Sequence, residues 1–442
     1  MMRKWVALAL VAAALSGCSI FGGHGKDKEK TPVLGERLPV LNYEADVQPD
    51  PALAEIQVAL PPAVMNDNWG QPGGSADKSN GNLALGSNLS PAWSVSIGEG
   101  SSARVHLAAG PVIAAGRVYT IDTAATVKAF DAANGHVLWT RSLDEKGDNK
   151  HALFGGGVSV VGDRVYATTG VGTVVALSAA DGHKLWEVTP GGPLRGAPTV
   201  ANNQVYVVSQ DNQLYALKAE DGSPEWDTAA TLEIAGVFGA AAPAVAQGTV
   251  VAGFSSGELN AYRYENGRIV WGDVLARTGI STSVSTLTDI DADPVIDEGK
   301  VYAVGQGGRM AALDIVTGQR LWELNVAGVS TPAVAGEWVF VVTDQAKLLC
   351  IARSSGKIRW IAELPRWRNE TRETKPIQWV GPVVAGDRLI LASSDGRMVF
   401  LSPSDGHLLT MFDVGTPVYL SPAVAANTLY VLDDKGRLTA WR

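Results

Sequence analysis

The sequence is poor in the residue types that build metal, haem and thiol sites. Its 442 residues include only two cysteines, Cys18 and Cys350, and six histidines. The cysteines stand far apart, which excludes a vicinal cysteine pair, a cysteine cluster and a C-x-x-C-H haem motif. No H-x-x-x-H or P-loop motif occurs either. We therefore expect no metal, no cofactor and no disulfide, and we expect Cys350 to be a small buried apolar residue.

Neither the charge nor the histidines indicate a ligand-binding centre. The 36 Lys and Arg residues are outnumbered by 45 Asp and Glu residues, and the net charge is −9. Because a protein that binds phosphate backbones needs a basic face, this balance argues against a nucleic-acid partner. Three histidines, His136, His183 and His407, follow a turn glycine at the same place in a repeated unit. We interpret them as surface turn residues and not as ligands.

Long apolar runs are scarce, and the run Trp5–Leu15 is too short to cross a bilayer. It leads into Leu15-Ser16-Gly17-Cys18, and small residues before a cysteine at this distance resemble the lipobox of bacterial lipoproteins. The resemblance implies that residues 1–17 are a signal peptide and that Cys18 carries several acyl chains, which anchor stably. With Ser19 next, it also implies the periplasmic face of the outer membrane. An ordinary signal peptide with an incidental cysteine is the alternative.

After Cys18 the chain divides into two parts of different composition. Residues 18–65 are rich in charge, Pro and Ala without a sustained period, and they predict a flexible tether. Residues 66–442 are dominated by a repeat, well seen in GPVIAAGRVYTIDTAATVKAFDAANGHVLW at Gly110–Trp139. Each copy ends with a turn glycine and, four residues later, a tryptophan. Copies end at Trp139, Trp186, Trp226, Trp271, Trp322 and Trp360, and a degenerate copy ends at Thr410.

The repeat predicts an all-β, eight-bladed β-propeller of four-stranded antiparallel blades. The last copy stops after its third strand at Arg442, and the missing tryptophan-bearing strand stands at Ala92–Val95. We therefore expect the N-terminal strand to complete the C-terminal blade and to close the ring, which removes a sheet edge. We interpret the tryptophans as packing between blades, with a weaker or repacked joint at Thr410. The strands of the first copy are expected at Val112–Ala114, Arg117–Asp122, Thr126–Asp131 and Val137–Leu143.

The pattern A-x-D-x-x-x-G-x-x-x-W resembles the quinoprotein repeat of pyrroloquinoline quinone dehydrogenases. It is complete at Ala129–Trp139 and recognisable at Ala176–Trp186 and Ala216–Trp226. The resemblance implies the fold and says little about catalysis. Such enzymes use a calcium ion, commonly two adjacent cysteines, and insertions for which a 442-residue chain has little room. We therefore predict that the protein is not an enzyme, and a dehydrogenase of this class is the alternative.

A second and closer resemblance lies in WGDVLARTGISTSVSTLTDIDADPV, from Trp271 to Val295. An extended loop followed by L-[ST]-D-[VI]-D-x-x-P-V resembles the BamB family, the lipoprotein subunit of the outer-membrane barrel-assembly machinery. The resemblance implies that Leu287, Asp289 and Asp291 lie on the face that docks the barrel subunit BamA. Carboxylates two residues apart in an extended loop point the same way and can meet a partner's Arg or Lys. Alternatively, they cap turns before the next strand.

The neighbouring contact loop of that family, L-x-L-R-G followed by A-P, is altered in this chain. The corresponding stretch is Ala235–Gly239 before Ala242-Pro243, where no Arg occurs and Phe238 takes its place after Val237. Phe offers apolar burial where Arg offers charge-assisted pairing, so either the partner surface has changed with it or the contact differs here. On this resemblance Val237 and Phe238 join the partner-binding residues.

One further loop carries an unusual composition for an acidic protein. It reads PRWRNETRETKP at Pro365–Pro376 and contains Arg366, Trp367, Arg368, Arg372 and Lys375. A basic, aromatic loop is suited to lipid headgroups, peptidoglycan or a second partner, and a solvated loop is the alternative.

Together these features predict a scaffold on the outer membrane. By resemblance, it binds the BamA insertase and its complex and aids the insertion of unfolded outer-membrane proteins. In a propeller the long inter-blade loops share one face, so we expect binding there, around Asp289, Asp291 and Phe238. A wall-binding, polysaccharide-binding or sensor propeller is a further alternative, and aromatic side chains lining the central channel would favour carbohydrate.

Overall fold

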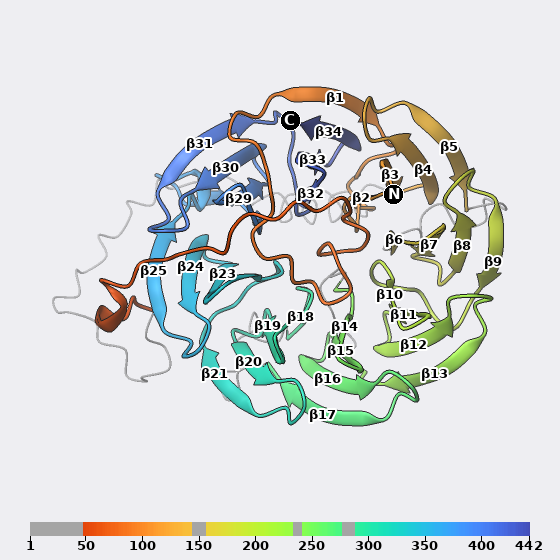
Figure 1. Cartoon of the computed structure of the whole chain (residues 1–442), viewed down its shortest axis with the longest axis horizontal. Helices are drawn as coiled ribbons and strands as arrows, with labels where there is room; N and C mark the ends of the chain where they lie inside the picture. Colours follow the sequence, from red (N-terminus) through yellow and green to blue (C-terminus); the bar gives the residue numbers. More distant parts are fainter. Residues whose placement is uncertain (1–46, 144–155, 233–240, 276–287) are drawn as a thin grey trace, which may run out of the picture. The chain divides into compact units, whose positions relative to one another are not determined.

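The computed structural model describes residues 47–143, 156–232, 241–275 and 288–442. Eight four-stranded antiparallel sheets stand around a common axis, as blades of a ring (Figure 1). The prediction of an all-β, eight-bladed propeller is confirmed. Within the described ranges no helix is long and apolar enough to cross a membrane. Among the described residues, one 3-10 turn, η2 (Pro51–Leu53), precedes the blades.

Each blade runs from an inner strand at the axis to an outer strand at the rim. Blade one contains β2 (Val112–Ala114), β3 (Arg117–Ile121), β4 (Thr126–Asp131) and β5 (Val137–Ser142), and blade two contains β6 (Gly156–Val161), β7 (Arg164–Thr169), β8 (Val174–Ser178) and β9 (Lys184–Val188). Blade three contains β10 (Thr199–Ala201), β11 (Gln204–Val208), β12 (Gln213–Lys218) and β13 (Pro224–Ala229), and blade four contains β14 (Ala244–Ala246), β15 (Thr249–Gly253), β16 (Glu258–Arg263) and β17 (Ile269–Val274).

The remaining blades follow the same order, except that the outer strand of blade eight comes from the N-terminal side. Blade five contains β18 (Val295–Asp297), β19 (Lys300–Val304), β20 (Met310–Asp314) and β21 (Arg320–Leu324), and blade six contains β22 (Ala333–Ala335), β23 (Trp338–Val342), β24 (Lys347–Ala352) and β25 (Ile358–Glu363). Blade seven contains β28 (Trp379–Ala385), β29 (Arg388–Ser393), β30 (Arg397–Leu401) and β31 (Leu408–Asp413), and blade eight contains β32 (Ala423–Ala425), β33 (Thr428–Leu432), β34 (Arg437–Trp441) and β1 (Pro91–Ser96).

Burial follows the position of a strand in its blade. The second strands are almost continuous apolar runs, and every residue of β11 is buried, because adjacent blades cover both faces of the sheet. Outer strands alternate, and β13 buries Trp226 while its neighbours on either side are exposed. The predicted strands of the first copy are found within one residue at each end.

One joint between blades repeats around the ring. The Trp271 indole N–H of blade four donates to the Ile315 carbonyl of blade five at 2.8 Å, and the ring lies over Gly318. Each such tryptophan therefore gains apolar burial and a partner for its polar edge. The interpretation of the tryptophans as interblade packing is confirmed. Equivalent N–H bonds join Trp93 to Ala132, Trp139 to Ala179, Trp186 to Ala219, Trp226 to Tyr264, Trp322 to Arg353 and Trp360 to Pro403.

The joint after blade seven is repacked, as the degenerate copy predicts. Thr410 occupies the tryptophan position on β31, and Phe412 two residues later stacks on Trp441 of blade eight with ring centroids 5.5 Å apart. Phe400 meets the same Phe412 edge-on at 5.4 Å. An aromatic contact thus joins these blades where the indole bond is missing.

Strand β1 lies at the outer edge of blade eight. It pairs antiparallel with β34, with Trp93 opposite Ala440 and Val95 opposite Leu438. Its Trp93 bonds to blade one in the manner of the other tryptophans, through Nε1 to the Ala132 carbonyl at 3.0 Å.

The last part of the predicted tether is docked. The Asp50 N–H donates to the Ile358 carbonyl of blade six at 2.8 Å, and the Asp50 carboxylate lies 2.8 Å from the Lys357 ammonium. Val58 is buried in a cluster with blades six and seven. A few apolar side chains spaced along an aperiodic segment are enough to hold it on the rim, which composition alone does not reveal.

Residues 64–83, called the plug below, cross the axis on the face of the short turns (Figure 1). Trp69 exchanges two backbone hydrogen bonds of 2.8 Å with Ile113, and the Gln71 amide does the same with Val200 at 2.8 and 2.9 Å. Because the inner strand of a blade has one unpaired edge, these bonds satisfy groups that would otherwise face the axis. Further bonds join Gly70 to Val160, Ala76 to Val245, Asp77 to Ile296, Leu83 to Val384 and Asn66 to Val424.

A matched pair of glycines in blade five tests the interblade joint. Gly299 and Gly318 both have left-handed backbones, with φ of 78° and 70°, but a Cβ on Gly299 meets nothing within 4 Å. A Cβ on Gly318 would lie 2.4 Å from Trp271 Cγ. We expect Gly299→Ala to lower the free energy of unfolding by about 1 kcal/mol, and Gly318→Ala by roughly 1–3 kcal/mol more, in urea titrations. Equal losses would contradict the proposed joint.

Candidate functional site

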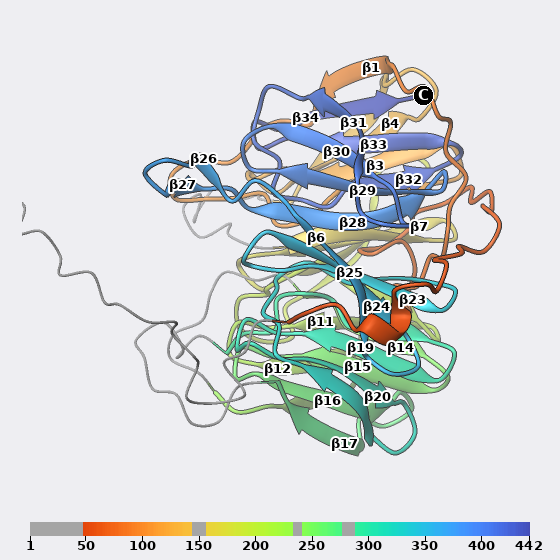
Figure 2. The same cartoon turned by 90° about the vertical axis from the view of Figure 1, so that its left-hand side faces the viewer.

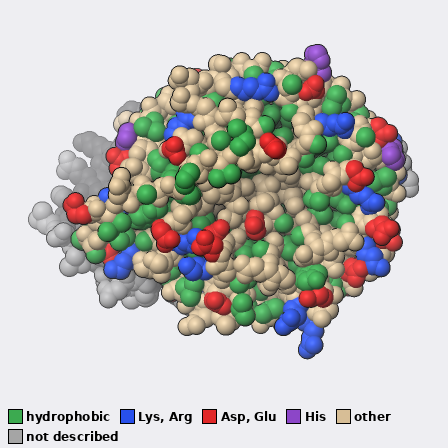
Figure 3. Space-filling model, viewed as in Figure 1, with side chains coloured by type: hydrophobic (Ala, Val, Ile, Leu, Met, Phe, Trp, Pro, Cys, Tyr) green, Lys and Arg blue, Asp and Glu red, His purple; other side chains and the backbone are tan. Residues whose placement is uncertain are grey.

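The axial channel forms a cavity of about 540 Å³ above the plug. Its floor comes from plug residues that include Trp69, Lys78 and Asn80. Its wall comes from the loops that lead from an outer strand to the next inner strand. Arg195 and Asp291 are two of the residues that these loops contribute. These connections share one face of a propeller, here called the long-loop face. The opposite face, seen in Figure 3, carries the plug and a mixture of acidic, basic and apolar side chains.

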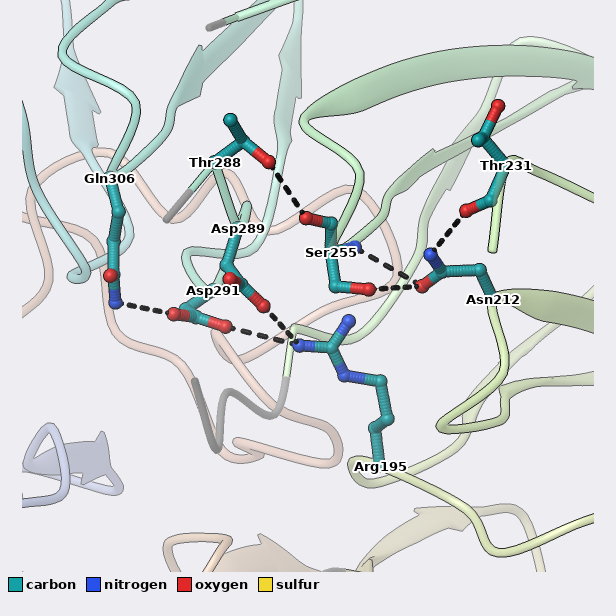
Figure 4. Close-up of polar contacts among 8 residues, drawn as sticks. All are labelled: Arg195, Asn212, Thr231, Ser255, Thr288, Asp289, Asp291 and Gln306. Carbon is teal, nitrogen blue, oxygen red and sulfur yellow. Dashed lines mark hydrogen bonds and ion pairs between the residues drawn. The ribbon is translucent and has the colours of Figure 1, made fainter. Parts of the chain in front are cut away.

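A buried charged cluster lies in the cavity wall, made of Arg195, Asp289, Asp291 and Gln306 (Figure 4). Arg195 precedes β10 of blade three, and its Nη2 is 3.3 Å from one oxygen each of Asp289 and Asp291, which precede β18 of blade five. The Gln306 amide, from the β19–β20 turn, donates to the other Asp291 oxygen at 2.6 Å. The cluster therefore ties together blades that are not neighbours.

The cluster carries one negative charge more than its cation balances when both carboxyls are ionised. Arg195 is 9% exposed and Asp289 is 0% exposed, so water screens these charges weakly. Burial raises the pKa of Asp291 to about 7, the Arg195 guanidinium opposes this rise, and the Asp289 charge adds to it. The second Asp289 oxygen has no hydrogen-bond partner among the described residues.

Backbone and hydroxyl contacts hold the acidic segment in place. The Thr288 hydroxyl donates to the Ser255 carbonyl at 3.0 Å, and the Ile290 N–H donates to the Phe254 carbonyl at 3.1 Å. Ile290 itself is fully buried between Asp289 and Asp291. This alternation explains the motif, because an apolar residue between two aspartates anchors the segment while both carboxylates turn to Arg195.

A series of hydrogen bonds continues from this segment toward blade three. The Asn212 amide oxygen accepts from the Ser255 N–H and hydroxyl at 3.1 and 2.8 Å, and its nitrogen donates to the Thr231 carbonyl at 2.7 Å (Figure 4). Hydrogen bonds and ion pairs thus connect blades three, four and five on the long-loop face.

A second pair of opposite charges lies at the cavity floor. The Lys78 side chain is 3% exposed, and its ammonium donates to the Thr199 hydroxyl at 3.2 Å. Burial lowers the pKa of Lys78 to about 8, while the charges of Asp293 and Asp77 oppose the shift. Burial also raises the pKa of Asp293, whose carboxylate accepts from the Ala242 N–H at 2.7 Å.

The structure brings together only part of the predicted site. Asp289 and Asp291 point at one cation, as the motif suggests, but that cation is Arg195 of this chain. Asp289 is fully buried and not free to meet a partner. The other predicted residues lie outside the described ranges, namely Cys18, Val237, Phe238 and Leu287.

Arg195 was missed from the sequence although a signal for it exists. Leu194-Arg195-Gly196 stands directly before Ala197-Pro198, which is the L-R-G and A-P order of the family's contact loop, one blade earlier than Phe238. Within the described ranges, no group of three or more His, Cys, Asp or Glu side chains is placed to hold a metal ion.

Comparison with known proteins identifies a family and several similar proteins. The family model described as outer membrane protein assembly factor BamB matches residues 123–362 and 365–441. The assembly factor BamB of Yersinia pestis is 27% identical, over all of this chain and 99% of that protein. The protein of the same name from Escherichia coli K12 is 28% identical, over 78% of this chain and 86% of its own length.

Solved structures share the fold. BamB from Moraxella catarrhalis matches with a TM-score of 0.68 and 19% identity, covering 80% of this chain and all of that one. Quinohemoprotein alcohol dehydrogenase from Comamonas testosteroni matches with a TM-score of 0.67 and 15% identity, covering 86% and 81%. Because an assembly factor and a dehydrogenase share this fold, the fold alone does not distinguish an assembly role from a catalytic one.

The buried carboxyl of Asp291 predicts a pH dependence of stability. Its folded pKa of about 7 lies above the ordinary value of 3.8, so between these values the folded state holds a proton that the unfolded state has lost. Stability from this group is therefore complete below pH 4 and is lost as the pH rises through 7. Relative to Asp291→Asn, wild type should lose on the order of 3 kcal/mol of unfolding free energy between pH 4.5 and 7.5. The same change in unfolding free energy between the two pH values for wild type and for Asp291→Asn, measured by urea titration, would contradict this.

Proposed function

The chain belongs to the BamB family of outer-membrane protein assembly factors, and from this premise we propose that it is a non-enzymatic scaffold of the barrel-assembly complex. It binds the BamA-type insertase with its complex and aids the insertion of outer-membrane proteins. Cys18 anchors it by acyl chains to the periplasmic face, and residues 18–65 form the tether, docked from Val47 onward. The observation that carries the proposal is the family match across most of the propeller.

We place the docking surface on the long-loop face, at the mouth of the axial cavity. Asp289 positions Arg195 and the segment around Ile290 from inside the wall, whereas Asp291 lines the cavity and is the carboxylate that a partner cation reaches. Because the cluster has one carboxylate in excess, a second cation complements it. We expect Leu287, Val237 and Phe238 to supply apolar contacts to the partner.

The rival reading, a quinone-dependent dehydrogenase, shares the fold but not the site chemistry. The chain has no adjacent cysteines, and its described residues offer no carboxylate cluster of the size that a calcium ion needs. The residues present do not fit that cofactor arrangement. The plug instead forms the cavity floor, where Trp69 exchanges backbone hydrogen bonds with Ile113 of blade one and the Asn80 amide donates to the Gly73 carbonyl.

We also propose that β1 closes the ring. Its pairing with β34 and the Trp93 bond to Ala132 join the last blade to the first from both sides. Trp93→Ala should then lower the thermal unfolding midpoint of the whole propeller about as much as Trp139→Ala does. An unchanged midpoint for Trp93→Ala alone would argue against closure by this strand.

Recovery of the insertase from solubilised outer membranes tests the assembly role. We expect the full-length chain to recover it, and Asp291→Asn to reduce the recovery roughly fivefold to tenfold, because a buried carboxylate that pairs with a partner is replaced by a neutral amide. This substitution suits the site better than charge reversal, which would place a second cation against Arg195.

Asp314→Asn, at the end of β20 on the opposite face, is the matched control and should behave as wild type. Circular dichroism and unfolding curves confirm that each variant is folded. Equal recovery by both variants would move the docking surface away from Asp291. No insertase with wild type would contradict the assembly role itself.

A further inference from the structure

A small two-stranded hairpin stands outside the eight blades. It is formed by β26 (Trp367–Asn369) and β27 (Thr374–Pro376), and it links the outer strand of blade six to the inner strand of blade seven. In Figure 2 it projects clear of the ring. Because it is a connection of the same type as the loops that carry Arg195 and Asp291, it stands on the same long-loop face as the cavity mouth.

The base of the hairpin is fixed to the propeller. The Trp379 indole donates to the Pro365 carbonyl at 2.9 Å, and the Ile377 N–H donates to the Arg366 carbonyl at 2.8 Å. Arg368 reaches back to the Ser394 carbonyl. These bonds hold the projection in one orientation, so its side chains are presented from a fixed support.

The hairpin concentrates positive charge on an acidic protein. Residues 365–376 contain four cations and two carboxylates, a net charge of +2, so the other residues of the chain sum to −9 − 2 = −11. Arg366, Arg372 and Lys375 are exposed and make no ion pair within the described ranges. Some other exposed cations have ion-pair partners, for example Lys184 with Glu187 and Lys357 with Asp50.

An aromatic side chain accompanies these cations. The Arg366 guanidinium lies 5.1 Å from the centroid of the Trp367 ring, which is only partly buried. Arg and Trp are the side chains that most often dominate protein interfaces, since they combine broad contact area with hydrogen-bonding edges. The stacked pair is therefore already arranged for contact with a surface.

We propose that this hairpin is a second docking point, which receives an acidic protein surface of the same partner that docks at the cavity mouth. The inference rests on the proposed function and adds the charge that the partner must present. Its position on the docking face favours a protein surface over a lipid surface. Since exposed charges act over about 8–10 Å at physiological salt, the hairpin chiefly speeds association and orients the partner.

Binding kinetics between the full-length chain and the detergent-solubilised insertase test this. The hairpin variant Arg366→Gln, Arg372→Gln, Lys375→Gln keeps Trp367 and the Arg368 brace. We expect its association rate to fall roughly threefold to tenfold at low salt, with the difference closing at high salt and the dissociation rate little changed. The matched control is Lys218→Gln, Arg263→Gln, Arg268→Gln, three exposed cations on the opposite face, which should associate like wild type.

The outcomes separate this inference from the proposed function. Binding by wild type with equal rates for the hairpin variant would overturn the second docking point and leave the assembly role intact. Equal rates together with hairpin-dependent binding to phosphatidylglycerol vesicles would overturn it in favour of a lipid surface. No binding by wild type would contradict the assembly role and the inference with it. Unchanged unfolding curves show that the exposed substitutions leave the fold intact.

Discussion

The contact between an outer-strand tryptophan and the turn of the next blade is the constraint on which the rest of the structure depends. Each indole donates to one turn carbonyl and covers one turn glycine, as Trp271 does with Ile315 and Gly318. Repeated around the axis, this contact fixes the angle between blades and thereby the places where the inter-blade loops converge. Arg195 of blade three can meet Asp291 of blade five only because that geometry is fixed.

Features with a local period could be predicted from the sequence, and features that depend on distant pairing could not. The strands, the number of blades and the repacked joint at Thr410 follow from one repeated sequence unit. The plug has no period, and its partners are scattered from Ile113 to Val424, so its course could not be derived. The Arg195–Asp291 contact spans 96 residues, and no pattern along the chain connects its ends. The motif identified the carboxylates but not the cation that they meet.

The two faces of the ring carry different structural features. The plug fills the axis on one face and satisfies the inner edges of the blades, which converts a channel into a cavity with a floor. The other face gathers the buried charged cluster and the cationic hairpin. A buried cluster with one carboxylate in excess favours a specific contact of slow dissociation, whereas an exposed cationic projection favours fast encounter. In the proposed function, the exposed projection recruits the partner and the buried cluster holds it.

The central claim is that the partner docks on the long-loop face at the cavity mouth. The most direct measurement places a photo-crosslinking residue at Tyr419, which is 40% exposed and lines that mouth, and another at Val316, which is 71% exposed on the opposite face. Irradiation of outer membranes should link the insertase to position 419 and not to position 316. Crosslinking from 316 alone, or equally from both, would contradict the claim.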